Sequence, residues 1–132
     1  MTPLEFAPAV EQCDRVIASA REAMAYVEEH PRVAHDEAPR EAVLLSLDVV
    51  AVIGAAQRML RRPFVDGRGA VLRRIVEAGV IACSETAAAI GLWSPAVLQW
   101  QQLARECEQC RDALRNVLSR EVHDAEGMSG AT

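Results

Sequence analysis

The sequence has few aromatic residues, which make up only 4% of its 132 positions. Apolar residues nevertheless account for 51%, and Ala, Val, Leu and Ile supply most of them. An apolar fraction this large excludes a mainly disordered chain. Small and medium aliphatic side chains suit closely packed helices, and the length fits one domain with little room for a second.

The sequence also lacks an excess of positive charge, with 14 Lys and Arg against 19 Asp and Glu and a formal net charge of −5. Phosphate contacts need a concentrated basic surface, so no nucleic-acid partner is expected. One dense basic cluster surrounds a predicted turn and comprises Arg58, Arg61, Arg62, Arg68, Arg73 and Arg74. Cations near helix carbonyl ends explain this cluster, and a phosphate site is the alternative.

A signal peptide and a long apolar run are missing as well. The first residues, MTPLEF, carry an acid and lack a basic start followed by an apolar stretch. The longest apolar stretch is interrupted by Asp48 and Gly54, so no membrane span is expected. We expect a cytoplasmic protein, in which thiols stay reduced. Its four cysteines then indicate core residues, metal ligands or redox groups more than structural disulfides.

Proline and glycine divide the chain into four helical segments. The spacing predicts helices over about Pro8–His30, Pro39–Arg62, Gly69–Leu92 and Pro95–His123. Short loops between them favour an all-α fold, an antiparallel up-down-up-down four-helix bundle over residues 1–123. Gly127 and Gly130 indicate a flexible C-terminal tail over residues 124–132.

Apolar residues recur at alternate steps of three and four along each segment, which is the spacing of a bundle core. The first row is Phe6, Val10, Cys13, Ile17, Ala20, Met24 and Val27. The second is Ala42, Leu45 or Ser46, Val49, Ile53, Ala56 or Gln57, and Leu60. The third is Leu72, Val76, Gly79, Cys83, Thr86 and Ile90. The fourth is Ala96, Trp100, Leu103, Cys107, Cys110, Leu114 and Val117.

The second segment is apolar around most of its circumference. Its apolar residues outside the core row are Val43, Leu44, Leu47, Val50, Ala51 and Val52. A helix that is apolar on all sides must be covered on more than one side, whereas every helix of a four-helix monomer has one side facing water. We therefore predict a homo-oligomer in which this segment forms a subunit interface.

Each segment contains a block of four core positions with the spacing x3, x2, x3. The blocks are Phe6-Val10-Cys13-Ile17, Ala42-Ser46-Val49-Ile53, Gly79-Cys83-Thr86-Ile90 and Leu103-Cys107-Cys110-Leu114. With the stretches SLDVVAVIGAAQRML, ACSETAAAI and CEQCRDAL, this pattern resembles the copper-storage family of four-helix bundles, whose helices carry C-x3-C-x2-C-x3-C. The likeness covers nearly the whole chain, but cysteine fills only four of the sixteen positions. The resemblance is thus to a degenerate member, for which bulk storage is in doubt.

The resemblance implies that a few Cu(I) ions bind to Cys13, Cys83, Cys107 and Cys110. In an antiparallel bundle, Cys13 should share a layer with Cys107, and Cys83 should share the adjacent layer with Cys110. Two soft thiolates suffice for a linear Cu(I) site, whereas Zn(II) prefers four ligands in a tetrahedron. Simple packing is the alternative, because buried cysteine behaves as a small apolar residue. A redox role for the Cys107-x2-Cys110 pair is disfavoured, since the pair lies in the middle of a helix.

A second candidate site lies toward one end of the predicted bundle, where Met24, Trp93 and Trp100 fall together. These side chains either fill the core or border an apolar pocket with an indole N–H as its polar group. Such a pocket would serve a small-molecule-binding protein or a biosynthetic enzyme. Asp48 is a further candidate residue of this pocket, either as a buried general acid or base or as a partner of an arginine across an interface.

The three histidines fall at or near predicted helix ends. His30 and His123 lie close to the ends of the first and fourth segments, and His35 lies in a loop. An imidazole near a helix C-terminus interacts favourably with the carbonyl groups there, which explains His30 and His123 without a metal. Antiparallel helices would also place those two residues at opposite poles.

Overall fold

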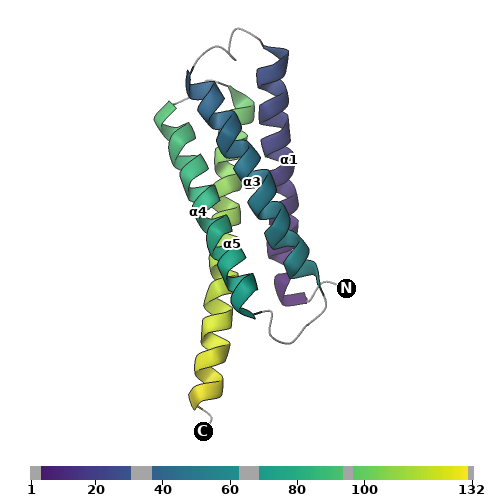
Figure 1. Ribbon diagram of the computed structural model, residues 1–132, viewed down its shortest axis with the longest axis vertical. Coiled ribbons are helices and arrows are strands. Elements are labelled where there is room, and N and C mark those ends of the chain that lie inside the picture. The colour runs from purple at the N-terminus through teal and green to yellow at the C-terminus, as the bar shows by residue number, and fades with distance from the viewer. Residues whose placement is uncertain (1–3, 31–36, 63–68, 94–96, 131–132) are drawn as a thin grey trace.

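The computed structural model describes residues 4–30, 37–62, 69–93 and 97–130. Its elements are η1 (Leu4–Phe6), α1 (Ala7–Glu29), α3 (Glu37–Arg61), α4 (Gly69–Trp93) and α5 (Leu98–Gly130). No strand occurs within these ranges. Figure 1 shows the long helices running side by side, each antiparallel to the one before it in the chain. The predicted all-α fold is confirmed.

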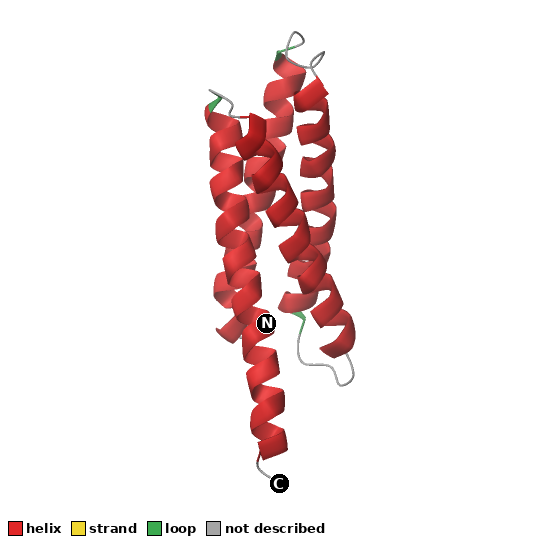
Figure 2. Cartoon of the chain, turned by 90° about the vertical axis from the view of Figure 1, so that its left-hand side faces the viewer, coloured by secondary structure: helices red, strands yellow, loops and turns green. Residues whose placement is uncertain are grey.

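The helices pack as a ring of four. α1 packs against α3 and α5, and α4 packs against the same two helices, so each long helix has two main neighbours. Figure 2 shows the same arrangement from the side. Because the first and last helices close the ring, this is the up-down-up-down bundle predicted from the short connections.

The helix ends agree closely with the sequence except at the C-terminus. Pro8 lies in the first turn of α1, where its missing N–H is tolerated, and Phe6 lies in η1 just outside that helix, as expected. The prediction that the last helix ends near His123 is wrong, since α5 continues to Gly130. Glycine weakens a helix by about 1 kcal/mol but does not end it unless a capping turn forms. Figure 1 shows the end of α5 projecting beyond the other helices.

The core rows predicted for the second, third and fourth segments are confirmed within the described residues. In α3 the buried alternatives are Ser46 and both Ala56 and Gln57, while Leu45 is half-buried. The row predicted for α4 is buried throughout, and that of α5 is buried from Trp100 to Val117. Ala96 lies outside the described residues.

The row predicted for α1 is partly wrong. Beyond Cys13 the buried apolar residues are Val16, Ala20, Ala23 and Val27, whereas Ile17 and Met24 are half-buried. Both rows have steps of three and four, so spacing alone does not separate them. Small side chains face the centre of the bundle, where helices approach closely, and the larger ones lie on the flank.

Gly79 marks the tightest of these approaches. A β-carbon added to Gly79 would lie 2.9 Å from Cδ1 of Leu114 and 3.0 Å from Cδ1 of Ile53. Those distances are shorter than ordinary van der Waals contacts between carbons. The absence of a side chain therefore lets α4 approach α5 and α3. These contacts disfavour a larger residue at this block position.

α3 is the most apolar helix by composition. Its stretch Arg40–Arg61 has a mean hydropathy of 1.7 and, by length and composition only, could cross a membrane, with 33% of the tested window buried inside the bundle. Its inner row packs against α1 and α4, and core helices of bundles pass the same test. Leu44 and Leu47 remain 63% and 50% exposed, so a large apolar area of α3 is uncovered in a single chain.

Candidate functional site: a row of four buried thiols

Four cysteines lie in the centre of the bundle. Cys13 comes from α1, Cys83 from α4, and Cys107 and Cys110 from successive turns of α5. Each is completely buried, and none forms a disulfide. The helical phase predicted from the sequence therefore brings all four thiols onto the interior of the bundle.

The four thiols form one connected row. Side-chain hydrogen bonding with Cys107 and Cys110 shifts the pKa of Cys83, and the pKa of Cys110 also responds to Cys13, so these sulfurs are neighbours. The predicted neighbours Cys83 and Cys110 thus meet. The contact of Cys13 is made with Cys110, one turn along α5 from its predicted partner Cys107. These contacts join the two expected layers, so the thiols are arranged as a row and not as two separate pairs.

The hydrogen bonds make the thiols unequal as acids. The pKa of Cys83 is lowered, because Cys107 and then Cys110 stabilise its thiolate, while burial acts in the opposite direction. The pKa of Cys107 is raised by its hydrogen bond to Cys83 and by burial. The pKa of Cys110 is raised by its hydrogen bonds to Cys13 and Cys83 and by burial. Of these three thiols, the thiolate is therefore favoured at Cys83 and opposed at Cys107 and Cys110.

The surroundings of the row contain no buried charge among the described residues. The nearest block positions with hydroxyl groups, Ser46 and Thr86, donate hydrogen bonds to the carbonyl oxygens of Ala42 and Ala82 in their own helices, each at 2.8 Å. Their protons are thus directed to the backbone. Val49 and Leu114, other block positions, are fully buried apolar residues. A thiolate in this core consequently depends on neighbouring thiols for stabilisation.

The row does not form a site with three or four ligands. Within the part of the chain that the structure describes, no group of three or more His, Cys, Asp or Glu side chains is placed to hold one metal ion. A tetrahedral zinc site, which needs about four converging ligands, does not fit this arrangement. Contacts between two sulfurs at a time do fit the two-coordinate preference of Cu(I).

A polar pair, Gln12 and Glu106, joins α1 to α5 beside the thiols. This pair was not predicted from the sequence. The side-chain nitrogen of Gln12 donates to the carboxylate of Glu106 at 2.6 Å and to its carbonyl oxygen at 3.4 Å. Each residue directly precedes a core cysteine, Cys13 or Cys107. The sequence places this glutamine beside a core position, and that could have indicated the pair. Gln12 is buried, and a buried side-chain amide needs a hydrogen-bond partner.

The structure describes only part of the predicted end pocket. Trp100 is fully buried and Met24 is half-buried, while the side chain of Trp93 lies outside the described residues. Asp48 is exposed, so its interpretation as a buried acid is wrong. It lies on the outer face of α3 and borders a hollow of about 220 Å³ that Ile81 of α4 also lines. Neither Met24 nor Trp100 lines this hollow.

His30 has a structural role at the end of α1. Its Nδ1 lies 2.8 Å from the carbonyl oxygen of Tyr26, and the two rings stack with centroids 4.1 Å apart. The imidazole thus bonds to one of the carbonyl oxygens that have no backbone partner at the helix end, as predicted. His35 and the side chain of His123 lie outside the described residues.

No protein-family model, curated protein or solved structure matches this chain. The resemblance to the copper-storage bundles therefore rests on the block pattern of the sequence.

Proposed function

We propose that this protein is a copper-storage-like bundle of low capacity that binds Cu(I) through pairs of its core thiols. The observation that supports this proposal is the row of completely buried thiols in contact with one another. Soft thiolates select Cu(I), and two of them satisfy it. A cytoplasmic location, as expected from the sequence, would keep these thiols reduced.

The number of sulfurs in each pair favours Cu(I) over a divalent ion such as Zn(II). In the metal-free row, the lowered pKa of Cys83 favours a thiolate that accepts hydrogen bonds from neighbouring S–H groups. When Cu(I) replaces the shared proton, S⁻···H–S plus Cu⁺ gives S–Cu–S plus H⁺, and the net charge of the buried group stays the same. Zn(II) prefers four ligands in a tetrahedron, so two sulfurs alone would leave it incompletely coordinated. The row thus fits Cu(I) better than Zn(II).

The pattern of contacts sets the capacity. Only one division of the row uses all four thiols in contacting pairs, namely Cys83 with Cys107 and Cys13 with Cys110. We therefore expect at most two tightly bound ions per chain, each between α5 and one neighbouring helix. This number agrees with the prediction of few ions and differs from the bulk storage of a core lined fully with cysteine.

The test is a titration of the reduced protein with Cu(I) against a competing chelator in the absence of oxygen. Cys107→Ala and Cys110→Ala should each reduce the tight stoichiometry from two to one, and the double variant should bind none. Thr86→Val is the matched control, because it changes a buried polar residue of the same core without removing a thiol. No tight binding by the native chain, or equal binding by the double variant, would refute the proposal.

The alternative from the sequence is a small-molecule-binding protein or biosynthetic enzyme with an apolar pocket near Met24 and Trp100. Trp100 is packed without exposure beside the fully buried Leu103. This packing is expected of a filled core. Organic ligand retained through purification, with no dependence of Cu(I) binding on cysteine, would favour the alternative.

A further inference from the structure

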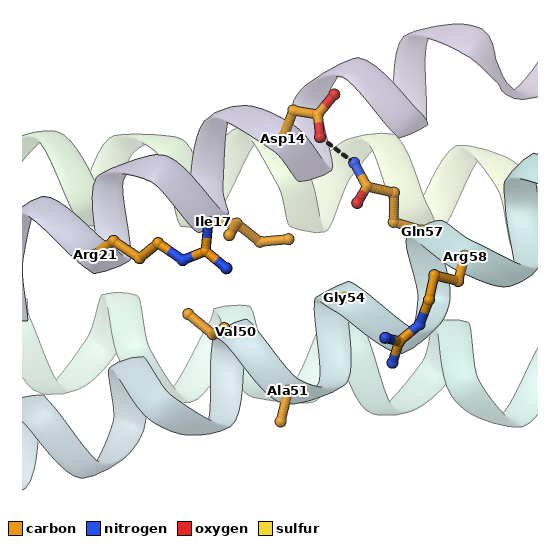
Figure 3. Close-up of a pocket in the computed structure, with 8 residues that line it drawn as sticks. All are labelled: Asp14, Ile17, Arg21, Val50, Ala51, Gly54, Gln57 and Arg58. Carbon is orange, nitrogen blue, oxygen red and sulfur yellow. Dashed lines mark hydrogen bonds between the residues drawn. The ribbon is translucent and has the colours of Figure 1, made fainter.

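We propose that a groove between α1 and α3 binds a small organic anion that carries an acidic group at each end, such as a dicarboxylate. The groove has a volume of about 410 Å³, which is in the range of small-molecule sites. Its cationic lining residues are Arg21 of α1 and Arg58 of α3. Figure 3 shows these two side chains at opposite ends of the groove, with Ile17 between them.

Both arginines are available for a ligand. Asp14, the acidic residue of the groove, already accepts hydrogen bonds from Gln57 and from Arg61, whose guanidinium lies 3.1 Å from Oδ2. Among the described residues, neither Arg21 nor Arg58 forms an ion pair. The groove therefore presents two unneutralised positive charges on a chain whose net charge is −5. A guanidinium binds a carboxylate through two parallel hydrogen bonds.

The middle of the groove is apolar and open. Ile17 and Val50 are half-buried lining residues from the two helices. Gly54 leaves space between the arginines, since a β-carbon added there would have no heavy atom of the surroundings within 4 Å. A short hydrocarbon body can lie against this surface while its two ends reach the guanidinium groups. An inorganic anion would use one arginine and leave the apolar section uncovered.

The rest of the molecule argues against a larger anionic partner. Nucleic acid requires a basic surface that extends over many phosphates. Here the two charges are confined to one groove, and Glu11 and Glu22 are exposed on the same helix as Arg21. The size of the groove and the separation of its charges thus favour a small ligand with two anionic ends.

The first test is calorimetric titration of the full chain with adipate, a six-carbon dicarboxylate, at constant ionic strength. Hexanoate, which has one carboxylate and the same chain length, should bind about tenfold more weakly. Arg21→Gln and Arg58→Gln should each weaken adipate binding about tenfold. Arg73→Gln is the matched control, because Arg73 is an exposed arginine of α4 that does not line the groove.

The second test fills the groove without changing its charge. Gly54→Leu places a side chain in open space, so the helix content should be preserved while adipate binding is lost. The proposal is overturned by three results: no adipate binding by the native chain, hexanoate binding as tightly as adipate, or unchanged adipate affinity in the Arg21→Gln/Arg58→Gln variant. Cu(I) stoichiometry should be the same in all these variants, so the outcome is independent of the thiol proposal.

Discussion

The sulfur of Cys83 differs from an ordinary thiol because two neighbours, Cys107 and Cys110, are hydrogen-bonded to it. We expect one thiolate per folded, metal-free chain to form below the ordinary cysteine pKa of 9.0, because these bonds lower the pKa of Cys83. Ultraviolet thiolate absorbance, followed during a pH titration, measures this. Cys83→Ala should remove the early thiolate, whereas Thr86→Val should retain it. A native chain whose thiolates all form above pH 9.0 would contradict this assignment.

Cys107 and Cys110, the two hydrogen-bond donors to Cys83, should make the folded protein less stable at alkaline pH. The pKa values of Cys107 and Cys110 are raised above 9.0 in the folded chain, so the unfolded chain releases these protons first as the pH rises. Their contribution to stability is full below pH 9.0 and is lost above it, with a limiting slope of about 1.4 kcal/mol per pH unit for each proton. Cys83 has the opposite sign, since its lowered pKa contributes stability that is lost as the pH falls.

Urea unfolding of the metal-free protein at a series of pH values tests this second prediction. The free energy of unfolding should fall between pH 9 and pH 10.5, and the fall should be smaller in the Cys107→Ala/Cys110→Ala variant. Comparison of slopes avoids the loss of stability that the cavities themselves cause, because that loss does not depend on pH. Equal alkaline slopes in the two proteins would show that these thiols ionise normally when buried.

At the scale of a helix, replacing Gly54 and Gly79 by alanine distinguishes the effect of helix propensity on stability from the effect of packing. Alanine is favoured over glycine by about 1 kcal/mol in a helix interior. Gly54→Ala should gain most of that stability, because its new methyl group meets nothing within 4 Å. Gly79→Ala should be less stable than Gly54→Ala by about 1–3 kcal/mol, because Leu114 and Ile53 must move. Thermal or urea unfolding of the pair checks this, and equal gains would refute the tight approach at Gly79.

The helices also show how far sequence reasoning reaches. The buried faces of α4 and α5 follow from the positions of their apolar residues, because each has one clearly favoured row. α3 is apolar around most of its circumference, so its sequence leaves alternatives at two core positions. α1 offers two rows with the same spacing, and the choice of Val16 over Ile17 depends on how closely the neighbouring helices approach. The distance between the helices is set by side chains from several of them, so it cannot be predicted from the sequence of one segment.

The thiol site was predictable in the same partial way. Helical phase placed Cys13, Cys83, Cys107 and Cys110 inside the bundle, and the structure agrees. The partner of Cys13 depends on the axial position of α1 against α5. Cys107 and Cys110 differ by three residues, or about 4.5 Å along the helix, and the Gln12–Glu106 pair is one of the contacts that fix this position. Contacts of this kind are settled only when the helices pack.

For the molecule as a whole, the outer face of α3 is the main feature without an explanation inside one chain. Leu44, Leu47 and Asp48 are exposed along this face. We propose that a second copy of the chain covers it. A membrane would have to bury the carboxylate of Asp48, which is costly, whereas an interface with a second copy can pair it with a cationic side chain at a hydrated rim. This arrangement retains the sequence-based interpretation of Asp48 as a partner of an arginine across an interface.

Light scattering tests this assembly directly. The native protein should have at least twice the 14.4 kDa mass of one chain, and Leu44→Glu/Leu47→Glu should have the mass of a monomer with unchanged helix content. Leu98→Glu is the control, because Leu98 is 64% exposed at the start of α5 and lies off the α3 face. Asp48→Ala should weaken association less than the leucine changes, since exposed ion pairs contribute at most about 1 kcal/mol. A native protein that stays monomeric at high concentration would contradict the proposal that a second copy covers the outer face of α3.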